Sequence, residues 1–307
     1  MKTSKLFLAF VCLTFITTAA FADTAKGGLR YSITVTKFDN AAGWSGRFDI
    51  GDAWGAVLTD LLNQTGKFIV LGEKDMRAEA LNEQDFAASG RTAGGKKAPV
   101  TGQMTPAQLL VKGKITHVQD NTAGAGGGVS IRGIRVGGGG GKGEVNATIY
   151  IVDSTTGQVL ASKSVVGVAG KRALGVGYSG GGFSGDVAGF KNDNVGKAVE
   201  SACSEAVKFL TEQLPKIPWS GSVVQVANGK VYINRGTREG VSVGQNFIVG
   251  TAEVIRDPDS GEVLDTNVTE IARLEVTEAK EKLSIARITK GNSSAVRKGM
   301  EVTASQQ

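Results

Sequence analysis

The chain has 307 residues, of which 41% are hydrophobic and 44 are glycine, about twice the usual share of glycine. This length allows two domains, and the hydrophobic content is sufficient for ordinary cores. The formal net charge of +6 is spread over residues of both signs. We therefore expect no nucleic-acid partner.

Residues 1–22 have the plan of a signal peptide: two lysines, an apolar run and the small-residue ending Ala20-Phe21-Ala22. Cleavage before Asp23 would remove Lys2 and Lys5 and lower the net charge from +6 to +4. The mature chain is thus predicted to leave the cytoplasm.

The two cysteines predict neither a disulfide nor a lipid anchor. Cys12 lies in the apolar run after Val11, where a lipoprotein signal has a small residue, so it is removed with the signal. Cys203 then has no partner, and its apolar helical neighbours predict a buried, inert thiol. No later run of 18 apolar residues predicts a spanning helix, so membrane insertion would have to use strands.

The first half of the chain alternates strand and helix patterns. Alternation predicts strands at 29–35, 68–71 and 110–118, and helical spacing from Ile50 to Leu62 predicts a helix ended by Gly66. A second helix is expected around Lys74–Leu81. Thr105 before Pro106 has the pattern of a helix cap with proline at the first helical position, which predicts a short helix at 105–108.

The central stretch, Val145–Gly167, reads as a β-hairpin with its turn at Ser154–Gly157. Glycine-rich arms flank it, Asp120–Gly143 before and Gly170–Asp193 after. A membrane-spanning strand needs about 9–11 residues, so each arm is long enough for an out-and-back pair.

A long amphipathic helix is predicted from Asn194, with one apolar stripe that stops at Pro215. Together these elements predict an α/β fold, a small sheet flanked by helices, over residues 23–214. Residues 215–219 form a proline-containing linker. Short strands at 222–226, 230–234, 245–254, 269–278 and 283–289 then predict a small β-barrel over residues 220–304.

Several motifs resemble chemical sites without their required context. Gly90–Lys96 lacks the hydroxyl residue and the preceding strand of a phosphate loop, and Gly175–Gly180 is not followed by a helix. His117 has no second imidazole or thiol for a metal site. Asp257 and Asp259 fit a hairpin turn without calcium. We therefore expect no catalysis, metal or cofactor.

Several segments together resemble the curli secretion channel family CsgG. They are the strand Tyr31–Phe38, the helix Asp52–Leu62, the segments Asn63–Leu71 and Leu110–Ile115, the hairpin Ile149–Leu160 and the closing helix. The resemblance covers roughly Leu29–Leu214. It implies a periplasmic domain that assembles into a homo-oligomeric ring, with two hairpins per subunit completing one outer-membrane barrel.

Those hairpins would be the two glycine-rich arms. Their expected membrane residues are Val129, Ile131, Ile134, Val136, Tyr178 and Phe183, with Phe190 joining the two aromatic residues at the interface. Ile131 and Ile134 have opposite parity across Gly133, which a bulge could restore. The alternative is that the arms remain in the periplasm as loops.

In the channel family the loop between the first strand and the first helix forms a constriction, which here would be residues 40–49. Asn40, Trp44, Arg47 and Phe48 are the candidates that would line it. The alternative for these aromatic residues is a cluster that covers the helix end.

The resemblance favours an outer-membrane secretion-channel subunit that passes an unfolded polypeptide by diffusion. The extra C-terminal region, with Val231–Gly236 and Gly240, resembles small domains of flagellar accessory proteins. It supports a different hypothesis, a soluble periplasmic scaffold or binding module of the flagellar-ring-accessory or penicillin-binding-protein-activator type, which contacts accessory proteins or cell wall.

Overall fold

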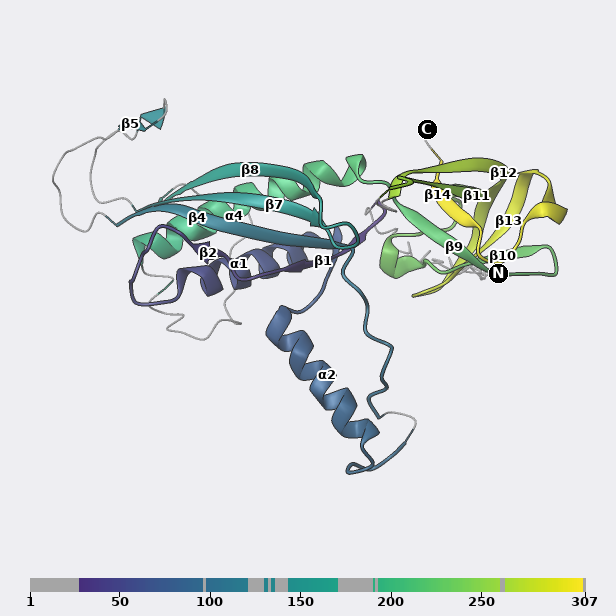
Figure 1. Ribbon diagram of the computed structural model, residues 1–307, viewed down its shortest axis with the longest axis horizontal. Coiled ribbons are helices and arrows are strands. Elements are labelled where there is room, and N and C mark those ends of the chain that lie inside the picture. The colour runs from purple at the N-terminus through teal and green to yellow at the C-terminus, as the bar shows by residue number, and fades with distance from the viewer. Residues whose placement is uncertain are drawn as a thin grey trace, which may run out of the picture.

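The computed structural model describes residues 28–95, 98–120, 130–131, 134–135, 143–170, 190, 193–259 and 263–305. The predicted signal peptide lies outside these residues. The described chain forms an α/β region followed by a β-barrel, which lie at opposite ends of the molecule (Figure 1). The α/β and barrel predictions are confirmed.

A mixed sheet organises the α/β region. Its strands follow the order β3-β1-β4-β7-β8, with β1 parallel to β3 and β4, and β4, β7 and β8 antiparallel. The predicted central hairpin is confirmed as β7 and β8. The bounds are β1 (Tyr31–Val35), β3 (Phe68–Val70), β4 (Leu109–Gln119), β7 (Glu144–Asp153) and β8 (Val159–Val168).

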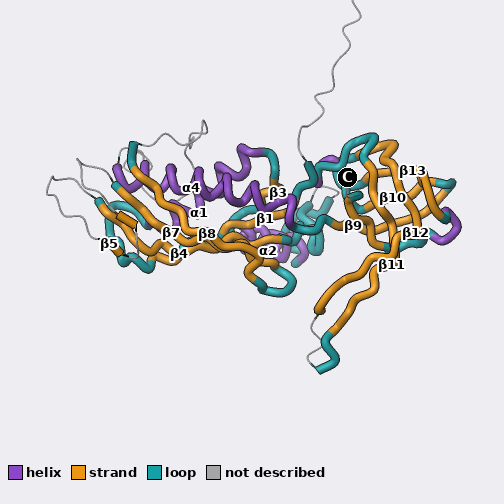
Figure 2. The backbone as a smooth tube through the Cα atoms, turned by 90° about the horizontal axis from the view of Figure 1, so that it is seen from above, coloured by secondary structure: helices purple, strands orange, loops and turns teal. Residues whose placement is uncertain are grey.

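Two helices, α1 (Ile50–Thr65) and α4 (Asn194–Gln213), cover one side of this sheet (Figure 2). Asp49 and Asp193 cap their N-termini by accepting hydrogen bonds from backbone N–H groups of the first turn. Gly66 ends α1 in the left-handed region at φ 62°, as predicted. The apolar side chains of β7 that point toward the helices, Val145, Ala147, Ile149 and Ile151, are buried.

A third helix, α2 (Lys74–Ala88), extends away from the sheet (Figure 1). None of its residues is buried. The helix expected at 74–81 is confirmed, but it continues to Ala88.

The short helix predicted at 105–108 is wrong, because these residues form a loop without helical structure. The hydroxyl of Thr105 accepts a hydrogen bond from Arg238, and its carbonyl accepts one from Arg77. Ser32 holds the same segment through its hydroxyl, which donates to the carbonyl of Pro106 at 2.8 Å. These tertiary contacts outweigh the local capping signal.

The barrel closes in the order β10-β13-β12-β11-β14-β9, with β9 pairing β10. The five expected strands are confirmed. A sixth strand, β14, has no counterpart among the predicted strands; it pairs with β11 and β9 and completes the closure. The strands are β9 (Ser220–Ala227), β10 (Lys230–Ile233), β11 (Asn246–Arg256), β12 (Val263–Ala279), β13 (Ser284–Gly291) and β14 (Glu301–Ala304), with short 3-10 turns η1 (Leu214–Lys216), η2 (Thr237–Glu239) and η3 (Ser293–Ala295).

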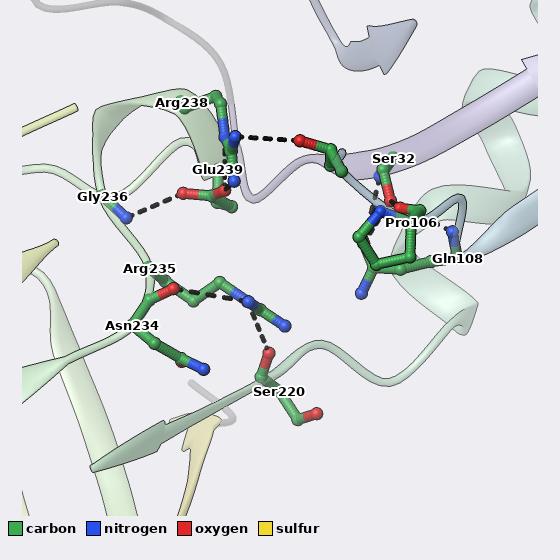
Figure 3. A network of polar contacts seen from close by, with 10 residues as sticks. Ser32, Pro106, Gln108, Ser220, Asn234, Arg235, Gly236, Arg238 and Glu239 are labelled. Carbon is green, nitrogen blue, oxygen red and sulfur yellow. Dashed lines mark hydrogen bonds and ion pairs between the residues drawn. The ribbon is translucent and has the colours of Figure 1, made fainter. Parts of the chain in front are cut away.

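Polar contacts join the barrel to the α/β region (Figure 3). The backbone N–H of Arg30 donates to the carbonyl of Glu239 at 2.9 Å. Nη1 of Arg238 donates to the hydroxyl of Thr105 at 3.3 Å. The buried carboxylate of Glu239 accepts from the N–H of Gly236 and from Nε of Arg238, so the network satisfies its charge.

Of the first glycine-rich arm, the structure describes β5 (Ser130–Ile131) and β6 (Ile134–Arg135), which pair antiparallel. Position 131 is directly opposite position 134. A change of parity across Gly133 is therefore what two antiparallel strands require, and a bulge within one strand is the wrong interpretation. Most of both arms lies outside the described residues, so the hairpin prediction stays a prediction.

Candidate functional site

The candidate site is the loop that joins β1 to α1. Within it, β2 (Asp39–Asn40) pairs in parallel with Lys114 and Ile115 of β4. The sequence pattern predicts only a loop for these residues. Because β4 is a central strand, this pairing ties the start of the loop to the rigid part of the sheet.

A tight turn follows at Asn40–Trp44. Nδ2 of Asn40 donates to the carbonyl of Trp44 at 2.7 Å, and the N–H of Trp44 donates to Oδ1 of Asn40 at 3.2 Å. Gly43 has a φ of 68°, which favours glycine. Asn40 thus holds the turn with its own side chain, as asparagine commonly does in turns.

Asp49 fixes the other end of the loop. Its Oδ1 accepts from the N–H groups of Gly51 and Asp52, and its Oδ2 lies 2.6 Å from Nζ of Lys37. Burial opposes ionisation of Asp49, but these hydrogen bonds outweigh it and hold its pKa below the usual value. The pKa of Lys37 is raised by its hydrogen bonds to Asp49 and Asp52. Both groups therefore remain charged at neutral pH.

Aromatic side chains pack beneath the loop. The ring of Phe48 lies 4.8 Å from that of Trp44 and 5.1 Å from that of Phe190, measured between ring centroids. Phe38 stacks on Trp54 at 4.9 Å. A Cβ added to Gly113 of β4 would lie 1.9 Å from the Phe38 ring, so this strand position requires glycine.

A cavity of about 800 Å³ lies between the loop and β4. The candidate residues Asn40, Trp44, Arg47 and Phe48 all line it, so the structure brings the four together. Sequence reasoning missed Lys37 and Lys112, which place two further cations there. No spacing signal connects Lys112 to the loop, since only the sheet brings them together.

The four candidates differ in exposure. Asn40 and Arg47 are exposed and Trp44 is half-buried. Phe48 is only 7% exposed, so its contacts fit the alternative of an aromatic cluster at the helix end. Phe190 is fully buried against Phe48. Its predicted place at the lipid interface is therefore wrong.

Most of the candidate membrane residues of the two arms lie outside the described residues. Val129, Val136, Tyr178 and Phe183 lie outside the described residues, and Ile131 and Ile134 are described by their backbone pairing alone. None of the helices in the described ranges is long and apolar enough to cross a membrane.

No cluster of metal-ligating side chains occurs among the residues that the structure describes. Cys203 is buried, as predicted, with its sulfur 4.0 Å from the carbonyl oxygen of Trp54. Burial raises the pKa of its thiol, which keeps the sulfur protonated and unreactive.

A mixed sheet with helices on one side and a separate closed barrel place the protein in the class of α/β folds with an added β-barrel. The sequence model described as "Curli production assembly/transport component CsgG" matches residues 17–245. The chain belongs to the CsgG family, which confirms the resemblance. This is a family of transport components associated with the cell envelope and outer membrane, not of enzymes.

Three solved structures align weakly with the chain. A PelC dodecamer from Paraburkholderia phytofirmans has 13% identity and a TM-score of 0.30, covering 58% of this chain and 86% of that one. Hypothetical protein CT253 from Chlamydia trachomatis has 9% identity and a TM-score of 0.33, covering 59% and 95%. Lipoprotein GNA1162 from Neisseria meningitidis has 20% identity and a TM-score of 0.23, covering 44% and 78%. No curated protein matches the chain.

Proposed function

We propose that this protein is the subunit of a homo-oligomeric secretion channel of the curli type, located in the outer membrane and facing the periplasm. The channel passes an unfolded polypeptide by diffusion. Membership of the CsgG family is the observation that carries this proposal.

The geometry of the loop supports a role as the constriction. Pairing of β2 with β4 and the Asp49 cap hold both ends of the loop, while Asn40, Trp44 and Arg47 keep solvent-accessible side chains between them. A constriction must keep its width while chain segments pass. These three side chains are the ones that contact the passing polypeptide, and Phe48 supports them from below.

Insertion is tested by alkaline carbonate extraction of outer membranes that contain the mature protein. Retention of the protein in the pellet supports insertion of the arms into the membrane. Release into the supernatant overturns the proposal that the protein is a channel subunit.

A second experiment deletes residues 129–142, which should abolish conductance in planar bilayers. The matched control shortens the hairpin of β11 and β12 by replacing residues 253–267 with an Asn-Gly turn, and it should conduct normally.

The constriction is tested by Arg47→Glu. Because Arg47 is exposed within the loop, reversal of its charge in every subunit should shift the ion selectivity of the pore toward cations, measured as the reversal potential in a salt gradient. Glu253→Arg on the barrel hairpin is the control. An unchanged reversal potential for Arg47→Glu would show that the loop does not line the pore.

One observation favours a second candidate, a soluble periplasmic scaffold or binding module. The barrel packs against the α/β region through partly buried polar contacts, and the hairpin of β11 and β12 projects from the barrel (Figure 2). Such a hairpin suits a contact with accessory proteins or cell wall. Release in the carbonate experiment, with an intact soluble oligomer, would favour this candidate.

A further inference from the structure

Helix α2 has 15 residues and buries none of them. A helix of this length is marginal in water without tertiary packing. Its clearest tie to the rest of the chain is at its first turns, where Nη1 of Arg77 donates to the carbonyl of Thr105 at 3.1 Å. Most of the helix is therefore available to another partner.

One side of α2 carries a regular stripe of two apolar and two acidic residues. Met76, Glu79, Glu83 and Phe86 follow the spacing i, i+3, i+7 and i+10, which places them on one helical face. All four are exposed, Met76 at 45% and Phe86 at 47%. From Glu79 to Phe86 the stripe is about 10 Å long. We call these four residues the α2 stripe.

The sheet side opposite α1 and α4 has a complementary pattern. The register aligns Leu110, Val152 and Val159 in one apolar row across β4, β7 and β8, and Val159 is 57% exposed. The next outward rows begin with Lys112 and Lys114. Lys112 forms no ion pair within the described chain, and Lys114 reaches Asp39 only at 3.9 Å. We call Leu110, Lys112, Lys114, Val152 and Val159 the sheet face.

We propose that the α2 stripe of one copy docks on the sheet face of a neighbouring copy. Phe86 packs on the row of Leu110, Val152 and Val159, while Glu83 and Glu79 pair with Lys112 and Lys114. The acidic stripe and the basic sheet face are complementary in charge. The five residues from Leu110 to Lys114 span about 13 Å, close to the distance from Glu79 to Phe86 in the stripe.

The two surfaces lie on different parts of one chain, and α2 points away from the sheet (Figure 1). A contact between unlike surfaces of identical copies is heterologous, and such contacts form a ring when the rotation between neighbours closes and a filament when it does not. The inference rests on the proposed homo-oligomer and names the surfaces that join its subunits.

The test uses two charge-reversed variants of the mature protein, Glu79→Lys/Glu83→Lys and Lys112→Glu/Lys114→Glu. Each variant alone sets like charges against each other and should dissociate, with the concentration for half-assembly raised by about 100-fold or more. An equimolar mixture of the two should assemble again, because each stripe then meets an opposite charge. Assembly is measured by sedimentation velocity, and folding of each variant by circular dichroism.

The matched control is Ala78→Lys/Asp85→Lys, which alters charge on another side of α2 and should assemble like the wild type. The docking proposal is overturned if the charge-reversed variants stay assembled, or if they dissociate and fail to assemble when mixed. In either case, a wild-type oligomer that conducts leaves the channel proposal intact. A wild-type protein that is monomeric overturns both.

Discussion

The barrel and the α/β sheet differ in their strand edges: the barrel closes on itself, whereas the sheet is open. In the barrel every strand has a neighbour on both sides, because β14 closes the gap between β11 and β9. In the described part of the α/β region, the ten residues of β8 form an edge of the sheet, one side of the sheet carries no helix, and α2 is solvated.

The barrel therefore pairs all of its strands within itself, whereas the α/β region leaves an edge strand, one side of its sheet and α2 open to contact. Closure removes edges that would otherwise pair with other chains. The barrel therefore has the features of an independent accessory, whereas the α/β region has those of an assembly unit. Each of the following changes breaks or sharpens that contrast.

The largest effect is expected from ending the chain after Met300, which removes β14. The barrel then becomes an open sheet with unpaired edges at β9 and β11, so its cooperative unfolding transition should be lost and the protein should aggregate. Calorimetry measures the transition and light scattering the aggregation. Ending the chain after Ala304 keeps β14 and should change neither, and an unaltered barrel transition without β14 would show that closure is dispensable.

In the α/β region, Trp54→Ala should reduce the free energy of unfolding by about 3–5 kcal/mol, because the fully buried indole leaves a large cavity beside Phe38. Trp54→Phe should cost less, since it keeps a ring and removes a buried N–H that has no partner. In a Trp44→Phe background the Trp54 variants keep Trp219 as their only tryptophan. Its fluorescence during urea unfolding then tests whether the barrel responds. Equal shifts of both regions would contradict their independence.

Loss of the loop's cap has a smaller effect. Asp49→Ala should lower the free energy of unfolding by about 1 kcal/mol, because α1 loses its N-terminal acceptor. Asp49→Asn keeps an acceptor and loses only the exposed ion pair with Lys37, so it should cost less. Thermal unfolding compares the two, and equal losses would assign the effect to the ion pair.

The smallest effect concerns Glu73, at the start of α2. Burial, and then the charges of Asp75 and Asp52, raise the pKa of its carboxyl to about 7 from the ordinary 4.5. The folded state therefore holds the proton more tightly, and its stability should fall as the pH rises from 4.5 to 7. Glu73→Gln should remove this loss. Its melting temperature should exceed the wild type at pH 8 and match it at pH 4, and a reversed order would contradict the raised pKa.

Much of the fold could be predicted because the patterns are local. Alternation in Val145–Ile151 and the turn at Ser154–Gly157 specify a hairpin, and Gly66 marks the end of α1. β14 was missed because four residues near the chain end carry no pattern of their own. The helix predicted at Thr105 was wrong because its capping signal is local. Arg238, which donates a hydrogen bond to the Thr105 hydroxyl, lies 133 residues away.

The candidate site was predicted only in part. The loop residues could be named by position, but the burial of Phe48 depends on Phe190, more than 140 residues later in the chain. Lys112 joins the site through strand pairing alone. Contacts of this kind depend on tertiary packing, which a single sequence does not reveal.

The course of β4 has a consequence for how this protein can change. The strand starts beside the segment that contacts the barrel and ends at Gln119, just before the first glycine-rich arm (Figure 1). Its 11 residues act as a rigid spacer of about 36 Å. An insertion at either end leaves the hydrogen-bond ladder of the other untouched. The sequences of the barrel contact and of the arm can therefore change independently, because β4 separates them and holds both in place.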